Sequence, residues 1–136
     1  MVQGSAMMTY LWVAIGGAIG SIARYWASGA VANAFGATFP WGTLIVNIVG
    51  SFIIGFTATL TGPLGRLLVP SDARVFVMVG ICGGFTTFSS FSLQTLNLMQ
   101  DGEWARAGAN TVGSFVLCML AVWAGHVAAA LLNEGA

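Results

Sequence analysis

Four stretches of the chain are nearly continuous runs of apolar residues, separated by short polar or turn-forming segments. Each run has roughly the 20 residues that a helix needs to cross a bilayer. Backbone polar groups cannot remain unpaired in lipid, so each run is predicted to be a transmembrane helix. The pattern therefore predicts an all-α integral membrane protein in which residues 1–136 form one domain, with spans at about residues 8–28, 42–60, 75–99 and 107–131.

The composition supports this interpretation. Of the 136 residues, 57% are hydrophobic and only 6% are charged, and the mean hydropathy is +0.89. A soluble domain carries about 25% charged residues, so this surface requires the lipid bilayer as its main solvent. The formal net charge is zero and there are only four basic residues, which excludes the basic patch that nucleic-acid binding requires.

Cys82 and Cys118 both lie deep in apolar runs, with no CxxC or Cys/His spacing around them. This placement favours small apolar packing residues over a disulfide or a metal site. The first ten residues lack a basic segment, and the first run carries Arg24 near its predicted end. We therefore do not expect a cleaved signal peptide.

The four arginines bear on the orientation of the chain. With four spans, both termini and the middle loop share one side of the membrane, and that side holds Arg66 and Arg74. The opposite side holds Arg106 and, at the predicted end of the first span, Arg24. A tie of two against two gives no preferred orientation by the positive-inside rule. Insertion in both orientations, with assembly as an antiparallel pair, is one interpretation, and a chance tie among so few charges is the other.

Small residues recur at a spacing that lets helices approach closely. Gly16 and Gly20 lie four residues apart in the first run, as do Gly80 and Gly84 in the third. Such small-xxx-small spacing is typical of packed membrane helices. It leaves open whether these faces meet within one subunit or between subunits, although an oligomer is expected.

The third run is the least typical of a continuous membrane helix. Gly83 and Gly84 are adjacent, and five of the seven residues at 86–92 carry a hydroxyl group. Glycine loosens the backbone and Ser/Thr side chains can pair with the groups that are freed. We predict a helix break near residues 83–87, which at membrane depth is tolerated where it lines a permeation or binding site. A merely kinked helix is the alternative.

Two further runs carry amides in their interiors. Asn47 follows Thr43 by one helical turn, and Asn110 precedes Ser114 by one turn, so each pair shares a helix face. These residues either form hydrogen bonds between helices or line a pathway.

No carboxylate lies within a predicted span. A proton-coupled cation exporter needs an intramembrane acid, and an intramembrane hydrolase needs an acid pair or a nucleophile with a base. The absence of a carboxylate from the spans counts against both functions. The single histidine, His126, lies near the end of the last run and is interpreted as interfacial or structural. The acidic residues all lie in loops or the tail, at Asp72, Asp101, Glu103 and Glu134.

Aromatic rings are interleaved with these neutral donors. Phe85, Phe88 and Phe91 recur every three residues through the expected break. An aromatic ring has a positive edge, so ring edges together with amide and hydroxyl donors can solvate an anion without a fixed positive charge. This lining suits a small, hard anion that must also be released.

Three segments of the chain resemble the Fluc (CrcB-type) family of fluoride ion channels: the motif Gly-Gly-Phe-Thr-Thr-Phe-Ser-Ser-Phe-Ser at 83–92, Gly-Thr-Leu-Ile-Val-Asn at 42–47, and the segment at 16–25. The resemblance covers all four spans in order, and it departs at Ser90, where the family usually has threonine. It implies an antiparallel dual-topology homodimer with two fluoride pores, each lined by both subunits. It also implies passive efflux of fluoride that protects the cell, in the plasma (bacterial cell or inner) membrane.

The resemblance also implies roles for individual residues. Arg24 would attract anions into a vestibule near the pore mouth, although an arginine there can equally snorkel to the interface. A structural sodium ion at the dimer interface would be held by the backbone carbonyls of Gly83 and Thr86. The residues expected to line the fluoride pore are Asn47, Phe88, Phe91, Thr43, Asn110, Ser114 and Ser89.

Two other functions remain as alternatives. A small dual-topology exporter of toxic cations would share the size and the charge tie, but it would exchange protons for its substrate. A non-conducting assembly subunit would carry the same polar residues as packing elements only. The chain is in either case not expected to be an enzyme, because its hydroxyl residues have no neighbouring base in sequence.

Overall fold

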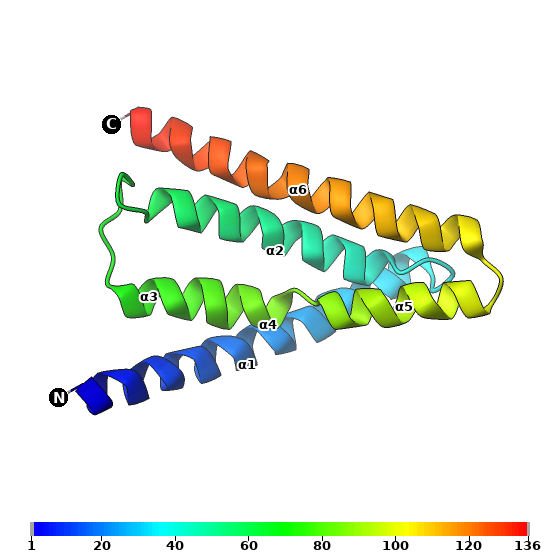
Figure 1. The fold of residues 1–136 in the computed structure, drawn as a ribbon, viewed down its shortest axis with the longest axis horizontal. Coiled ribbons are helices and arrows are strands. Elements are labelled where there is room, and N and C mark those ends of the chain that lie inside the picture. The colour runs from blue at the N-terminus through cyan, green and yellow to red at the C-terminus, as the bar shows by residue number, and fades with distance from the viewer. Residues whose placement is uncertain (1, 136) are drawn as a thin grey trace.

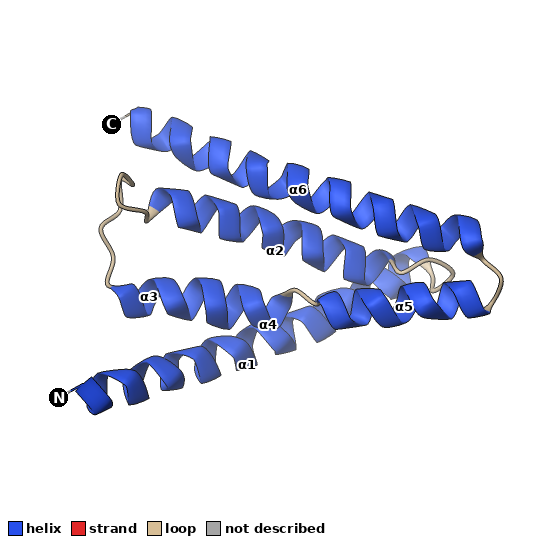
Figure 2. Ribbon diagram, in the orientation of Figure 1, coloured by secondary structure: helices blue, strands red, loops and turns tan. Residues whose placement is uncertain are grey.

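Four long helical spans lie side by side in the computed structural model, which describes residues 2–135 and has no strand among them (Figures 1 and 2). All four are long and apolar enough to cross a membrane, which confirms the predicted span count. The third span is divided into several pieces, including a π-helical stretch, η1. The elements are α1 (Val2–Phe35), α2 (Trp41–Leu60), α3 (Ser71–Val75), η1 (Phe76–Cys82), α4 (Gly83–Phe85), α5 (Phe88–Gln100) and α6 (Trp104–Glu134).

The helices extend beyond the predicted spans, most of all in α1. The prediction ended the first span near residue 28, but α1 continues to Phe35 and has 34 residues. The helix continues past the apolar run because residues 29–35 are less apolar but still rich in alanine, the strongest helix former. Gly36 then ends the helix with a positive φ of 84°, and its N–H donates to the Ala32 carbonyl at 2.8 Å.

The order of the helices places both chain ends together. The two termini and the α2–α3 connection lie at one end of the bundle, and the α1–α2 and α5–α6 connections lie at the other (Figure 1). This is the arrangement that four successive crossings require. α2 packs along α6, and α1 packs against the first half of the third span.

Reciprocal glycine contacts join α1 to the third span within the subunit. A Cβ atom built on Gly16 would lie 3.0 Å from the Gly80 Cα, and one built on Gly80 would lie 2.9 Å from the Gly16 Cα. A Cβ on Gly84 would meet the Gly17 Cα at 3.1 Å. These distances leave no space for a side chain, so the predicted small-residue faces pack on each other inside one chain.

The α2–α6 pair is closed in the same way and carries the histidine. Gly55 of α2 lies against the backbone of Val122, and Gly125 of α6 lies against the backbone of Phe56. His126 Nδ1 lies 2.8 Å from the Thr59 hydroxyl. This contact between α2 and α6 supports the structural interpretation of His126.

Candidate functional site

The third span is interrupted at Thr86 and Thr87, as the sequence predicts. Thr86 has extended backbone angles (φ −83°, ψ 157°), and so does Thr87 (φ −153°, ψ 112°). The Thr86 hydroxyl donates to the Cys82 carbonyl at 2.8 Å and closes the first half of the span. The Thr87 hydroxyl accepts the Ser90 N–H at 3.1 Å and caps the start of α5. The hydroxyl residues that favoured the break are therefore the ones that complete its hydrogen bonds.

Two side chains from other helices form hydrogen bonds with backbone groups at the break. Asn47 of α2 forms two bonds to the backbone of Thr87: its Oδ1 accepts the N–H at 2.7 Å, and its Nδ2 donates to the carbonyl at 3.1 Å. Arg24 of α1 donates from Nε to the Gly84 carbonyl at 3.0 Å. Each end of the interruption thus has a polar partner, which backbone groups within a membrane span require.

The break also redirects two backbone donors. In a continuous helix the N–H of Thr87 would reach the Gly83 carbonyl, and that of Ser90 would reach the Thr86 carbonyl. Here the first is donated to Asn47 and the second to the Thr87 hydroxyl. The carbonyls of Gly83 and Thr86 are thereby released from their helical donors. Among the described residues no group of three or more His, Cys, Asp or Glu could hold a metal ion.

A cavity of about 470 Å³ lies beside the break. We call it the central cavity. Six of the predicted site residues line it, and none of its lining residues is charged. The rings of Phe88 and Phe91 stand 5.3 Å apart at an angle of 46°. The six are Asn47, Gly83, Thr86, Phe88, Phe91 and Ser114.

A second, smaller cavity of about 280 Å³ lies on the other side of Thr87, and we call it the polar chamber. Thr87 lines both spaces. Arg24 and Thr43 lie in the polar chamber among hydroxyl groups. α1 continues past Arg24 to Phe35. The bond from Arg24 to Gly84 holds the guanidinium beside the break.

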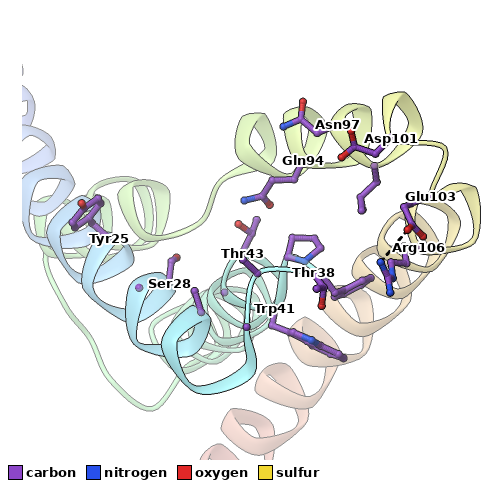
Figure 3. Close-up of a pocket in the computed structure, with 18 residues that line it drawn as sticks. Tyr25, Ser28, Thr38, Trp41, Thr43, Gln94, Asn97, Asp101, Glu103 and Arg106 are labelled. Carbon is purple, nitrogen blue, oxygen red and sulfur yellow. Dashed lines mark ion pairs between the residues drawn. The ribbon is translucent and has the colours of Figure 1, made fainter.

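A third cavity, of about 690 Å³, lies at the end of the bundle, and we call it the mouth cavity (Figure 3). The mouth cavity and the polar chamber share Tyr25, Ser28, Thr43 and Gln94 as lining residues. Figure 3 shows α1, α2, α5 and the start of α6 contributing side chains around it. Neighbouring cavities thus share lining residues, from the bundle end to the middle of the third span.

The remaining predicted pore residues lie in different surroundings. Asn110 is 2% exposed and hydrogen-bonds to Thr95 and Ser114 inside the subunit. Ser89 is exposed, and its hydroxyl lies 3.3 Å from that of Thr87. The structure therefore brings Asn47, Phe88, Phe91 and Ser114 together, while Asn110 stands behind Ser114.

Sequence reasoning missed two residues at this site. Thr87 was predicted only to lie within the helix break, yet it lines both the central cavity and the polar chamber. Thr95 was not considered, although it follows Phe91 by one helical turn and therefore lies on the same face. That spacing was the available signal.

Comparison with known proteins identifies the family. Residues 11–126 match the family model described as CrcB-like protein, Camphor Resistance (CrcB). The chain is 66% identical over 128 residues to a fluoride-specific ion channel FluC of Opitutus terrae, covering 94% of this chain and 97% of that protein. It is 62% identical over 128 residues to the FluC of Rhodospirillum rubrum, covering 94% and 99% of the two chains.

These relatives confirm the resemblance found in the sequence. They are named as ion channels, which also confirms that the chain is not an enzyme. With the four helical spans, the match makes the protein a multi-pass membrane protein. The chain belongs to the CrcB family.

Proposed function

We propose that this chain is a fluoride-specific ion channel that lets fluoride leave the cytoplasm passively. The names of its relatives support the ion. The observation that carries the proposal is the break at Thr86 and Thr87, which brings the N-terminus of α5 to the central cavity. A helix N-terminus presents free N–H groups and the positive end of the helix dipole, and both favour an anion.

The uncharged lining suits fluoride in particular. One N–H of the Asn47 amide is used by Thr87, and the second remains as a donor. The edges of Phe88 and Phe91 carry positive partial charge and add to the α5 N-terminus. An unpaired ion in a low-dielectric interior costs tens of kcal/mol, so the lining must replace the water shell. Neutral donors can do so and still release the ion.

The charged guanidinium of Arg24 lines the polar chamber, which fluoride would enter before the central cavity. Fluoride would pass from the mouth cavity into the polar chamber, where the Arg24 guanidinium attracts it, and then past Thr87 into the central cavity. Because Arg24 also donates to the Gly84 carbonyl, its charge is partly shared with the backbone. This sharing limits how tightly the chamber holds an anion, and tight holding would slow release.

The proposal includes an antiparallel homodimer with two pores, supported by incomplete features of the single chain. Phe88 is 79% exposed although it lines the central cavity, so one wall of the pathway requires a partner. The Gly83 and Thr86 carbonyls also fit the proposed structural sodium ion, since carbonyl oxygens are ligands of hard cations. Two oxygens from one chain are too few for such an ion, and a second copy would double the number.

The position of Arg24 changes the balance of positive charge between the two sides of the membrane. Because Arg24 lies inside the bundle and binds the break, it no longer counts as a loop charge. Arg66 and Arg74 then stand against Arg106 alone. A difference of one charge is a weak bias, so insertion in both orientations stays part of the proposal.

The lining of the central cavity supports passive efflux, since it includes no Asp, Glu, His, Lys or Arg that could couple transport to protons. A membrane potential of about 100 mV, negative inside, drives a monovalent anion outward by roughly 2.3 kcal/mol. Hydrogen fluoride enters acidified cells as a neutral acid and dissociates in the cytoplasm. A passive pathway for the anion in the plasma membrane, the inner membrane of a bacterial cell, would therefore protect against fluoride.

The direct test is ion efflux from liposomes that contain the purified protein. We expect rapid fluoride efflux, measured with a fluoride electrode after addition of a potassium ionophore, and essentially no chloride efflux under the same conditions. Chloride efflux as fast as that of fluoride would contradict the proposed selectivity. Fluoride efflux that requires a proton gradient would instead favour an exchanger.

The mouth cavity should limit how fast anions arrive. Two carboxylates and one guanidinium line it, and Arg106 pairs with Glu103 at 3.2 Å (Figure 3). Asp101 is left as the charge that repels an approaching anion. Unit charges at contact distance in water interact by about 1 kcal/mol, so Asp101→Asn should raise fluoride efflux a few-fold at low ionic strength. The increase should vanish at about 1 M salt, where charges are screened within about 3 Å. An increase that persists at high salt would contradict the electrostatic explanation.

A further inference from the structure

A continuous chain of hydrogen bonds runs from the central cavity to the backbone of α5. The Ser114 hydroxyl donates to Asn110 Oδ1 at 3.3 Å. Asn110 Nδ2 donates to the Thr95 hydroxyl at 2.9 Å, and that hydroxyl donates to the Phe91 carbonyl at 2.8 Å. Two members of the chain are almost fully buried, Thr95 at 7% and Asn110 at 2% exposure.

The direction of these bonds is fixed by chemistry. The Phe91 carbonyl can only accept a hydrogen bond, so the Thr95 hydroxyl must donate its single proton to it and accept from Asn110. The amide nitrogen of Asn110 therefore faces Thr95, its oxygen faces Ser114, and Ser114 must be the donor at that end. The Ser114 proton is thus directed away from the central cavity in this state. The Ser114 bond is the longest of the three and is the one that an anion in the cavity can most readily replace.

This series of hydrogen bonds joins α5 to α6. The break separates α5 from the first half of the third span, and α5 carries both Phe88 and Phe91. Of the residues 88–100, Thr95 is the only one that is buried. α2, by comparison, has six buried residues. Beyond the cap at Thr87, the buried side chain that joins α5 to another helix is thus Thr95.

We propose that Thr95 is a positioning residue of the conduction pathway, acting with Asn110. Through Asn110 it holds α5 and the Phe91 ring against α6. It also directs the Ser114 proton toward Asn110 Oδ1 and away from the central cavity. This inference rests on the proposed fluoride channel. It gives Asn110 a supporting role behind the lining in place of direct contact with the ion.

The test uses Thr95→Val, which keeps the shape of the side chain and removes the hydroxyl, against Thr95→Ser, which keeps it. Efflux is followed from liposomes that hold at most one channel each, so the fraction of vesicles that empties counts folded channels and the rate reports conduction. We expect Thr95→Val to slow the rate about tenfold with the fraction unchanged, and Thr95→Ser to stay within about twofold of the wild type. A loss confined to the fraction of vesicles would mean a folding role only and would overturn the proposal.

Ser92→Ala is the matched control. The Ser92 hydroxyl donates to the Phe88 carbonyl at 2.9 Å, as Thr95 does to Phe91, but it is exposed and makes no bond to another helix. It should leave the rate unchanged. An equal slowing by Ser92→Ala would assign the effect to bending within α5 and contradict the anchor.

A double variant covers the case in which Thr95→Val leaves Asn110 unpaired and prevents folding. Replacing both buried partners by apolar residues removes the unpaired group, so Thr95→Val with Asn110→Leu should fold. We expect it to conduct about tenfold more slowly than the wild type. Wild-type rates in this double variant would refute the anchor, whereas a wild-type protein that passes no fluoride would refute the channel itself.

Discussion

Asn47→Asp should reduce fluoride efflux by at least about a hundredfold. The amide of Asn47 both accepts from the Thr87 N–H and donates to the Thr87 carbonyl, and a carboxylate can only accept. The substitution therefore sets an oxygen against the Thr87 carbonyl and loosens the break. It also adds a negative charge to the central cavity, where repulsion at about 5 Å and an effective dielectric constant of about 20 amounts to roughly 3 kcal/mol, or a hundredfold in rate.

Asn33→Asp provides the control for this prediction. Asn33 is exposed in the last part of α1 and does not line any of the three cavities. The same change of amide to carboxylate should there leave efflux within about twofold. Both variants are compared in the same liposome assay, after gel filtration has shown the same elution volume as the wild type. Normal efflux through Asn47→Asp would mean that Asn47 neither holds the break nor faces the ion.

The break was predictable because its cause is local. Adjacent glycines and a run of hydroxyl residues weaken a helix whatever surrounds it, and the interruption at Thr86 and Thr87 lies inside the predicted 83–87 segment. The span count was predictable for the same reason, since each apolar run carries its own signal. Local sequence thus determined the number of crossings and the place of the interruption.

The partners of the break could not be predicted. Arg24 and Gly84 are 60 positions apart, and Asn47 and Thr87 are 40 apart. The sequence offers several residues that could have accepted or donated these bonds. The end of α1 was also missed, because the apolar pattern measures the thickness of the lipid and not the length of the helix. At 1.5 Å per residue the 34 residues of α1 span about 51 Å, beyond the roughly 30 Å of a hydrocarbon core.

Asn110 is a predicted pore residue that does not line the central cavity of the single chain. Matching positions indicated a pore-lining residue, whereas the structure places the side chain behind Ser114 with its amide bonded to Thr95 and Ser114. The sequence alone had left bonding between helices open as the alternative. A helix-face argument cannot separate the two, since a residue that lines a pore and one that supports it lie on the same side of a helix.

Phe88→Ile should also reduce fluoride efflux by about a hundredfold, with little effect on folding. The ring is 79% exposed in the single chain, so its loss removes little packing within the subunit. What is lost is the positive ring edge, which isoleucine cannot supply. An ion with one side of its water shell left unreplaced faces a barrier higher by several kcal/mol, and each 1.4 kcal/mol is tenfold in rate.

Phe35→Ile is the matched control, because Phe35 is 64% exposed at the end of α1 and lies outside the three cavities. It should conduct normally. The elution volume in detergent should be unchanged for both variants, which separates a lost pathway from a lost assembly. If Phe88→Ile kept its fluoride efflux while Asn47→Asp lost it, the anion would be carried by the amide and the α5 N-terminus alone. The ring edges would then serve only as walls, and the selectivity against chloride would have to come from the width of the pathway.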